Sequence, residues 1–547
     1  MAYQISPDCI GCMLCHRGCP QGAIFGEKKQ RQTIDASLCI ECGYCANVCG
    51  FGAIRDEQGQ SLSRIPKKEW PKPIIDRATC VGCSVCVQNC PGNCLEIESA
   101  KYHGDIQTIA ILARSDQCIG CKICQSVCPI HAISFPNDLP EKEKWNMGKV
   151  YCRIYQGVLK IGMYFIPWGV PQTIEGPGSV RRLPALIQSK GIQKVLVVTD
   201  EVLHRQLHML DGLFDEMAAL GLQYVVYDGV QPNPTDRNLQ EGAKLFREHD
   251  CEAMIAFGGG SPMDCAKGIG AMIARPKKTL AQLHGLFRVL RRIPAIFAVP
   301  TTSGTGSETT VAAVITDSQT HHKASLNDTC LMPKYAILDP ELTKGLPKKV
   351  TSTTGMDAMC HAVEAFTNRT YNTRLENEYA MEAVRLIYNN LLTCCEEPEN
   401  SDARMNMMLA AFKAGRAFTR GCVGYVHAIG HTLGGLYGTP HGLAMAVILP
   451  HVMRQFGPAV HERLARLAEV CGYREGGDAQ KADWFLTWIE ELERAMDIPR
   501  HLDNIRDEDY DRIIEWAMKE ANPLYPVPVI WEKADFIRCL DTIRGKI

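Results

Sequence analysis

The pattern C-x2-C-x2-C-x3-C occurs four times near the start of the chain, and no other feature constrains the fold as strongly. Of the 27 cysteines among 547 residues, 17 lie in residues 1–150. The flanking sequences CPQGAI, CGFGAI, CPGNCLEI and CPIHAI are also alike, so the pattern is an internal repeat arranged in two pairs. The four runs comprise Cys9, Cys12, Cys15, Cys19, Cys39, Cys42, Cys45, Cys49, Cys80, Cys83, Cys86, Cys90, Cys118, Cys121, Cys124 and Cys128.

The spacing within each run favours iron–sulfur chemistry. Three thiolates at i, i+3 and i+6 can hold three corners of one cubane cluster, and the fourth cysteine reaches a neighbouring cluster. Zinc sites use C-x2-C pairs separated by long gaps, and disulfides belong to oxidising compartments. Cys94 is the odd cysteine: it stands where Ala23, Ala53 and Ala132 stand in the other repeats, which favours a small buried filler over a ligand.

Composition narrows the class of protein further. The formal net charge of −2 gives no overall field for nucleic acid or an anionic membrane. No apolar run reaches the roughly 18 to 20 residues that span a bilayer. The first residues lack the basic start and apolar stretch of a signal peptide, so the cytoplasm is the expected location. Oxygen-labile clusters fit an anaerobic cell.

From about residue 150 the pattern changes to short β-branched runs separated by amphipathic stretches. This alternation predicts a parallel sheet covered by helices. Beyond about residue 341, helix-period stretches dominate at 375–392, 403–418 and 482–496, which predicts a second, helical domain. The expected strands are 192–200, 222–230, 253–260, 293–300 and 334–340.

These observations divide the chain into five parts. The two cysteine pairs are separated by a basic, proline-broken stretch, and a polar, charged stretch follows the second pair. The expected parts are two two-cluster modules at 1–62 and 74–136, a linker at 137–162, an α/β domain at 163–340 and a helical domain at 341–547.

A glycine turn follows the third expected strand of the sheet. Gly258 and Gly260 fit the first two glycines of G-x-G-x-x-G, but Met263 stands at the third, so a plain turn is the alternative. Asp200 ends the first strand, where a carboxylate selects NAD over NADP; its alternative role is a helix N-cap. A second turn at 300–308, PTTSGTGSE, is suited to hold a phosphate or an amide.

A histidine-rich segment predicts a metal site. Asp357 and His361 are four residues apart and share one face of a helix, and His427 and His431 repeat that spacing. His441 follows across a Gly-Thr-Pro turn. Isolated histidines are usually core or surface groups, but three within fifteen residues, with a spaced Asp–His pair elsewhere, favour a metal.

At these motifs, residues of about 163–547 resemble the iron-containing (group III) alcohol dehydrogenases, and the cysteine pairs resemble two bacterial two-cluster ferredoxins. The resemblance implies α+β ferredoxin-like modules followed by an α/β domain and an all-α domain, the dehydroquinate synthase-like fold. It implies that His431 is the catalytic group that helps to relay a proton. The implied ligands of the divalent metal are Asp357, His361, His427 and His441.

The resemblance also implies contacts with NAD and a division of the cysteines into four sets. The implied NAD contacts are Asp200, Gly259, Gly260, Ser261, Asp264, Thr301, Thr302, Thr305 and Lys323. The implied sets are set A (Cys9, Cys12, Cys15, Cys49), set B (Cys39, Cys42, Cys45, Cys19), set C (Cys118, Cys121, Cys124, Cys90) and set D (Cys80, Cys83, Cys86, Cys128).

The function implied is an NAD-dependent alcohol dehydrogenase or aldehyde reductase. A divalent metal, Fe2+ or Zn2+, would polarise the alcohol or carbonyl oxygen for hydride transfer. Four 4Fe-4S clusters favour an electron relay to a ferredoxin-dependent redox partner over a purely structural role. Small alcohols or aldehydes are the expected substrates, and a homo-oligomer is the expected assembly.

Two alternatives stay open at this point. The chain is either this dehydrogenase or an electron-transfer or scaffold subunit of a larger redox complex with a secondary or inactive dehydrogenase domain; the intact Asp-His-His-His set argues against inactivity. Arg420 is either a cation near the pocket, which would favour an acidic aldehyde, or a surface or interface arginine.

Overall fold

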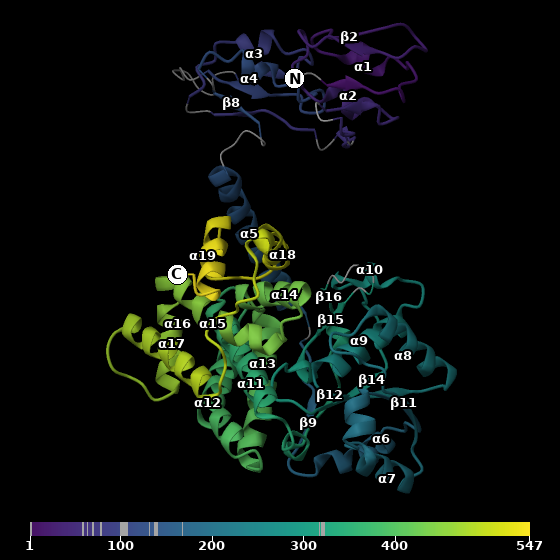
Figure 1. Ribbon diagram of the computed structural model, residues 1–547, viewed down its shortest axis with the longest axis vertical. Coiled ribbons are helices and arrows are strands. Elements are labelled where there is room, and N and C mark those ends of the chain that lie inside the picture. Colours follow the sequence, from purple (N-terminus) through teal and green to yellow (C-terminus); the bar gives the residue numbers. More distant parts are fainter. Residues whose placement is uncertain are drawn as a thin grey trace. The chain divides into compact units, whose positions relative to one another are not determined.

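The computed structural model consists of two compact units, Met1–Gly148 and Lys149–Ile547 (Figure 1). Short strands and one-turn helices make up the first unit, whereas the second has a large sheet and long helices. The structure describes residues 3–56, 59–62, 64–67, 70–76, 79–98, 108–130, 132–135, 141–166, 168–316, 318 and 323–546.

The first cysteine pair folds as two short antiparallel ribbons with two helices. Each helix follows a residue with positive φ, Met13 or Gly43, which turns the chain sharply between the second and third cysteines. Ile5, Ile24 and Ile54 are buried between the ribbons. The elements are β1 (Gln4–Ile5) with β4 (Ile54–Arg55), β2 (Ile24–Phe25) with β3 (Thr33–Ile34), α1 (Leu14–Gly18) and α2 (Tyr44–Val48).

The second cysteine pair repeats this arrangement and contacts the first. The rings of Tyr44 and Trp70 meet edge to face at 5.9 Å between centroids. Lys72 Nζ donates a hydrogen bond of 2.6 Å to the carbonyl of Cys118, so the segment between the pairs joins them into one unit. The elements are β5 (Ile74–Ile75) with β8 (Ile133–Ser134), β6 (Leu95–Ile97) with β7 (Ala110–Leu112), α3 (Val85–Gln88) and α4 (Ile123–Ser126).

Most of the expected linker at 137–162 is instead helix α5 (Glu141–Tyr164), and residues 137–140 lie outside the described part. From Lys149 onward α5 belongs to the second unit. Cys152 is buried in the helical core, and Gln156 Nε2 donates to the carbonyls of Pro523 and Tyr525. Contacts with chain more than 360 residues away order this helix, and local composition does not reveal such contacts.

The second unit contains a six-stranded parallel sheet, as the sequence predicted. All five expected strands are present, and β9 joins as an edge strand that the sequence did not predict. The register pairs Val197 with Ile255 and Ile255 with Phe297. The order is β11 (Gln223–Tyr227), β10 (Lys194–Val198), β12 (Ala253–Gly258), β14 (Ala295–Pro300), β17 (Tyr335–Leu338) and β9 (Gln172–Glu175).

Helices and a small second sheet surround this parallel sheet. The small sheet was not predicted either; its order is β13 (Gly285–Leu286), β16 (Lys323–Asn327) and β15 (Ala312–Thr316). Apolar side chains from the strands and helices form the cores of this domain. The helices are α6 (Leu183–Ser189), α7 (Asp211–Ala219), α8 (Asp236–Glu248), α9 (Gly260–Ala274) and α10 (Leu280–Leu283).

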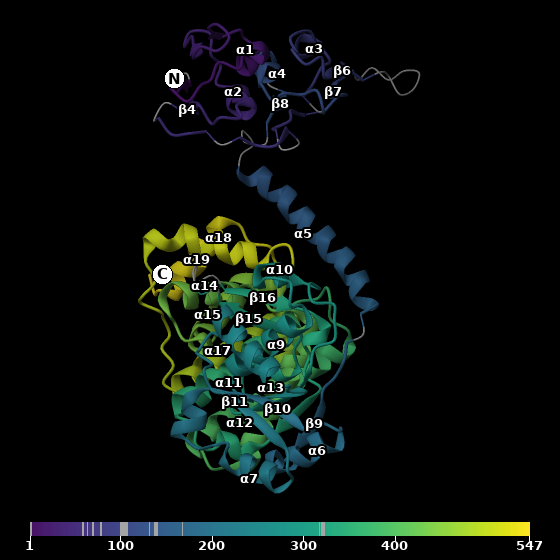
Figure 2. The ribbon, with the colours of Figure 1, turned by 90° about the vertical axis from the view of Figure 1, so that its right-hand side faces the viewer.

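The rest of the second unit is helical, as expected, with α11 at its centre. Between Thr351 and Thr367 nearly every residue of α11 is buried. Helix α14 packs against α15 and α18, and α15 packs against α19 (Figure 2). Among the described residues, no helix is both long and apolar enough to cross a membrane. The helices are α11 (Lys348–Thr367), α12 (Arg374–Glu396), α13 (Ser401–Gly421), α14 (Tyr425–Tyr437), α15 (His441–Phe456), α16 (His461–Val470), α17 (Asp478–Ala495), α18 (Tyr510–Ala521) and α19 (Lys533–Ile543).

Candidate cluster, metal and dinucleotide sites

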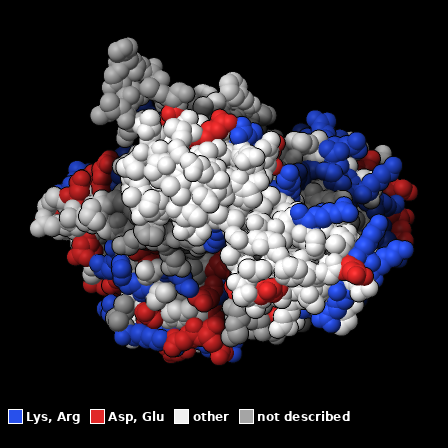
Figure 3. Space-filling model, turned by 90° about the horizontal axis from the view of Figure 1, so that it is seen from above, with Lys and Arg blue, Asp and Glu red and all other residues white. Residues whose placement is uncertain are grey.

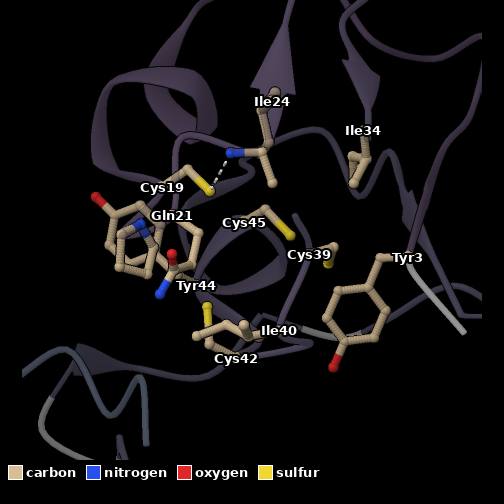
Figure 4. Close-up of a pocket in the computed structure, with 13 residues that line it drawn as sticks. Tyr3, Cys19, Gln21, Ile24, Ile34, Cys39, Ile40, Cys42, Tyr44 and Cys45 are labelled. Atoms are coloured by element: carbon tan, nitrogen blue, oxygen red, sulfur yellow. Dashed lines mark hydrogen bonds between the residues drawn. The ribbon is translucent and has the colours of Figure 1, made fainter. Parts of the chain in front are cut away.

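The structure groups the thiols of the first unit in the four sets A to D. Set B surrounds one hollow, in which the sulfur atoms of Cys19, Cys39, Cys42 and Cys45 lie close together (Figure 4). Sets A and C each line a similar hollow. In set D, the pKa of the Cys86 thiol is raised first by burial and then by the neighbouring sulfurs of that set. Each fourth cysteine therefore lies with the partner run.

The sets also have an order within the unit. Burial raises the pKa of Cys42, and among the neighbouring thiols Cys121 of set C raises it most. Sets B and C therefore face each other where the two modules meet. Cys12 of set A and Cys83 of set D are exposed, whereas Cys121 is buried. This arrangement gives the order A, B, C, D, with one exposed cysteine residue in each of the two end sets.

In the second unit, a carboxylate and three imidazoles converge from three helices. Asp357 and His361 lie one turn apart on α11, His427 lies in the first turn of α14 and His441 begins α15. Asp357 Oδ1 lies 3.3 Å from His441 Nε2, 3.7 Å from His427 Nε2 and 3.9 Å from His361 Nε2. The sequence placed all four residues in one metal site. In the structure, ligand atoms of Asp357, His427 and His441 lie within 4.8 Å of one another, and His361 adjoins Asp357.

The donor atoms of this group fit a divalent cation. Asp357 Oδ1 and His427 Nε2 are buried, and neither has a hydrogen-bond partner among the described residues. Buried polar atoms without a partner are rare because leaving water without a new bond costs free energy. One carboxylate oxygen and three imidazole nitrogens are a ligand set that Fe2+ or Zn2+ accepts.

The electrostatics favour the metal-binding protonation state of Asp357, His361 and His441. Burial alone would raise the pKa of Asp357, but the neighbouring His361, His441 and His427 together hold it well below its usual range. Burial lowers the pKa of His361 to about 3 and also lowers that of His441. An anionic Asp357 beside neutral His361 and His441 is the protonation state that metal binding requires of these three groups.

Glu364 completes the site, although the sequence analysis missed it. Its Oε2 lies 2.5 Å from His427 Nδ1, and its Oε1 accepts a hydrogen bond of 2.8 Å from Val426 N. Burial would lower the pKa of His427, but Glu364 and Asp357 raise it to about 9. Glu364 follows Asp357 by seven residues and so lies on the same face of α11, but the spacing alone does not show that this glutamate is buried.

His431 lies between the metal ligands and a partly exposed glutamate. Its ring stacks on His441 at 5.2 Å between centroids. Its Nδ1 lies 2.7 Å from Glu520 Oε1 on α18, and Tyr525 Oη donates to the same oxygen at 3.0 Å. Because the packing of α14 on α18 places Glu520 here, sequence spacing gave no sign of it.

The two turns expected to bind a nucleotide are in contact. Gly258 has φ +144°, and the next residue precedes the first turn of α9. A Cβ on Gly260 would lie 2.8 Å from Thr305 Cγ2, and one on Gly259 would lie 3.3 Å from Thr302 Oγ1. The absence of side chains here lets the second turn pack onto a helix N-terminus, where backbone amides favour an anion.

The second turn also reaches the metal site. Thr301 at its start is buried, and a Cβ on Gly304 would lie 2.7 Å from Thr354 Cβ. Thr354 is one turn before Asp357 on α11. The loop at 300–308 therefore contacts both the glycine turn and the helix that carries two of the metal ligands.

Comparison with known proteins identifies the family to which the second unit is similar. Residues 171–340 match the model of iron-containing alcohol dehydrogenases, and residues 351–541 match the C-terminal domain of the same family. The chain is 38% identical over 355 residues to 1,3-propanediol dehydrogenase of Klebsiella pneumoniae, covering 63% of this chain and 90% of that protein. The chain belongs to the iron-containing alcohol dehydrogenase family.

Solved structures of this family agree. A 1,3-propanediol oxidoreductase is 34% identical, with a TM-score of 0.66 over 69% of this chain and 100% of its own. Sulfoacetaldehyde reductase of Bifidobacterium kashiwanohense, solved in complex with NAD+, is 26% identical, with a TM-score of 0.62 over 70% of this chain and 99% of its own.

The first unit matches models of a different kind. Residues 8–53 and 73–135 each match a 4Fe-4S dicluster domain, and a third such model spans 38–95, across both cysteine pairs. This iron-containing alcohol dehydrogenase therefore carries ferredoxin-type modules. The matches confirm the predicted fold class, the dehydrogenase activity and the expected cofactors, namely NAD, iron and 4Fe-4S clusters.

Other residues expected at the NAD site have partners within the protein. Asp200 Oδ1 accepts a hydrogen bond of 3.0 Å from Leu203 N, so the alternative N-cap role is present at this position. Ser261 Oγ accepts one of 3.3 Å from Asn233 N. Lys323 begins β16, and its side chain lies outside the described part.

Asp264 is also engaged within the protein. Its carboxylate accepts from Ser307 Oγ at 2.7 Å and from Val314 N at 3.0 Å. Lys267, which the sequence analysis missed, is fully buried and donates to Ser307 Oγ and Thr310 Oγ1 at 2.8 Å each. This network fixes the end of the second turn against α9.

The side chain of Arg420 contacts a backbone carbonyl and two aromatic rings of the same chain. Its Nε donates to the Tyr371 carbonyl at 3.0 Å, and its guanidinium carbon lies 5.9 Å from the Tyr164 ring and 6.0 Å from that of Trp168. These contacts within the chain favour the surface or interface alternative over a cation in the substrate pocket.

Proposed function

We propose that the second unit interconverts a small alcohol and its carbonyl compound with NAD, using a divalent ion held by Asp357, His361, His427 and His441. The observation that supports this most strongly is that Asp357 Oδ1 and His427 Nε2 are buried together and neither has a hydrogen-bond partner in the part of the chain that the structure describes. The loop at 300–308 supports the proposal because it connects this site to the glycine turn. An inactive scaffold would not require such a ligand set, so that alternative is not favoured.

The residues divide the chemistry among them. When bound, the ion would polarise the substrate oxygen and NAD would accept the hydride from the alcohol carbon. Glu364 holds the ring of His427, and Asp357 supplies the negative charge. His431 takes the hydroxyl proton in alcohol oxidation and passes it toward Glu520, whose side chain is 31% exposed. In the reverse direction the same pair returns the proton.

The surroundings favour an uncharged substrate. Arg420, the cation that would have marked an acidic aldehyde, is engaged by Tyr371 and two aromatic rings. The relative from Klebsiella pneumoniae is named for 1,3-propanediol. We therefore propose short uncharged alcohols and diols, and the corresponding aldehydes, as the substrate class.

The first unit would exchange electrons with a separate, ferredoxin-dependent redox protein. Near the exposed Cys12, the side chains of Ile10, Leu14 and Phe51 are more than half exposed and line the hollow of set A. Figure 3 shows a face of the molecule with a broad area that carries no charged side chain. Apolar contact around an exposed cluster suits a transient partner. We also propose a homo-oligomer in the cytoplasm, where thiols stay reduced.

The test uses the full chain purified without oxygen. NADH formation from NAD is measured with ethanol, 1,2-propanediol and 1,3-propanediol, for the wild type and for Asp357→Ala, with His461→Ala as a histidine control away from the site. We expect activity with at least one alcohol, lost only in Asp357→Ala. No NADH from any alcohol would overturn the proposal.

A second measurement tests the partner. The clusters are followed by EPR while NADH is added to the isolated chain, and then while a reduced ferredoxin is added. We expect reduction by ferredoxin. If NADH alone reduced all the clusters at the rate of turnover, the clusters would serve the dehydrogenase site directly and the separate partner would be unnecessary.

A further inference from the structure

We propose that the thiol of Cys94 donates a hydrogen bond to the Cys90 thiolate and makes the cluster of set C easier to reduce than the other three. This inference rests on the proposed clusters and goes beyond them, because it ranks their reduction potentials. It also gives a role to the one cysteine in the first unit that no ligand set uses.

The geometry around Cys94 carries the proposal. Its Sγ lies 3.2 Å from Cys90 Sγ, which is within hydrogen-bond range for sulfur. The residue is 2% exposed and lines the same hollow as the four thiols of set C. Cys94 packs beside Leu95 and Phe135, so water does not compete for its proton.

The fourfold repeat supplies internal controls. In every repeat the residue four positions after the fourth cysteine donates its backbone N–H to that cysteine's sulfur, at 3.2 to 3.4 Å. This backbone bond is therefore common to all four sets; in set D, Ala110 N also donates to Cys80 Sγ at 3.4 Å. Alanine occupies this position in three repeats, and cysteine adds a side-chain donor in one. The donor and acceptor pairs are Ala23 and Cys19, Ala53 and Cys49, Cys94 and Cys90, and Ala132 and Cys128.

The direction of the effect follows from charge. Reduction places one more electron, and so one more negative charge, on a cluster held by thiolates. A hydrogen bond to a ligand sulfur stabilises this more negative form more than the oxidised form, which raises the reduction potential. Only the neutral thiol of Cys94 has a hydrogen to give, and its apolar surroundings disfavour a further thiolate.

The position of set C determines where an added electron would reside. Sets B and C face each other at the junction of the modules, so set C is internal in the order A, B, C, D. An electron that enters at either exposed end would come to rest on set C. The first unit would then store one electron away from its surface until a partner draws it out.

The experiment is an anaerobic, EPR-monitored redox titration of the full chain with dithionite as reductant. In Cys94→Ala we expect the potential of one cluster to fall. At a fixed poise, its reduced-to-oxidised ratio should drop about tenfold, which corresponds to about 59 mV for a one-electron couple. In Cys94→Ser the hydroxyl should restore most of this shift. Unchanged potentials in Cys94→Ala, or an equal fall in Cys94→Ser, would overturn the proposal.

A cluster-content measurement, one further variant and a parallel activity assay separate the role of Cys94 from effects on cluster assembly and from the proposed function. Cys94→Ala should hold as much iron and sulfide as the wild type, because alanine serves at this position in the other repeats. Ala132→Cys should raise the potential of set D, and no rise would count against the proposal. NADH formation from alcohol is measured in parallel: its absence in the wild type would refute the proposed function, whereas unshifted potentials would refute only the role of Cys94.

Discussion

The two units of this protein are held together by different means. In the second unit, large apolar side chains such as Phe366, Phe485 and Trp531 are almost fully buried in extended cores. In the first unit the cores are small, and cysteine is a large part of them. In one of these cores, Leu95, Ile133 and Phe135 are the only large apolar side chains that are buried among the described residues, beside thiols of sets C and D. Modules this small bury too little apolar surface to fold alone.

This difference teaches which part of the molecule needs its metal for folding. The thiols of the first unit meet around hollows that only the clusters can fill and bond, so metal binding and folding are coupled there. In the second unit, Asp357 and His361 sit on a helix that is buried by its own packing. Loss of the single cation should therefore abolish the dehydrogenase activity but leave the second unit folded.

The largest expected effect is therefore cluster removal. After exposure to oxygen and an iron chelator, we expect the first unit of the full chain to lose its amide protection, while the sheet and helices of the second unit keep theirs. Hydrogen exchange followed by peptide mass spectrometry measures both in one sample. Equal protection of the first unit before and after treatment would contradict the comparison.

Asp357→Ala should have the next largest effect, confined to the second unit. The polarising cation is worth several kcal/mol, so turnover should fall about 10³-fold. Metal content and NADH formation are the measurements. Asp509→Ala is the control, because Asp509 is also a buried carboxylate in this domain but binds Tyr437 and Arg506. Metal retention in Asp357→Ala would count against the site.

Glu364→Gln should weaken the site without emptying it. Loss of the carboxylate that orients His427 typically costs about 10- to 100-fold in metal affinity or activity. Metal affinity is measured by competition with a chelator. Glu376→Gln is the control, since Glu376 is a buried glutamate that accepts a hydrogen bond from Thr373 N at the start of α12. An equal loss in both variants would indicate a general effect on packing.

Glu520→Gln should have the smallest effect. Glu520 acts through His431, so we expect turnover to fall about tenfold or less, below the range for a direct general acid–base group. Cluster content and metal content should not change. Glu515→Gln, an exposed position on the same helix, is the control. If both variants kept full turnover over the pH range of activity, the proton route would not include Glu520.

What the sequence could predict also differs between the units. The cysteine runs are local, and their repetition in pairs led to the four sets that the structure groups together. Asp357 and His361 were found from one helical turn. Glu364 lies on that same face, but a glutamate in a helix usually faces solvent, so its burial at 1% exposure could not be foreseen. Glu520 depends on how α18 packs on α14, which no local pattern encodes.

The misplaced elements have the same cause. Helix α5 was expected as a linker because its start is charged, yet contacts with the last part of the chain order its second half. Strand β9 has only four residues and exists by pairing with β17. In the small sheet, β13 likewise has only two residues and exists by pairing with β16. Pairing partners, not propensity, decide such elements.

The central claim is that a single cation in the second unit, separate from the clusters, supports NAD-linked alcohol oxidation. The most direct measurement is NADH formation by the anaerobic full chain after a chelator has removed the divalent ion, with acid-labile sulfide measured on the same sample. The account predicts lost activity that Fe2+ or Zn2+ restores, with sulfide constant throughout. Activity that survives removal of the ion, or that disappears only as sulfide is lost, would contradict it.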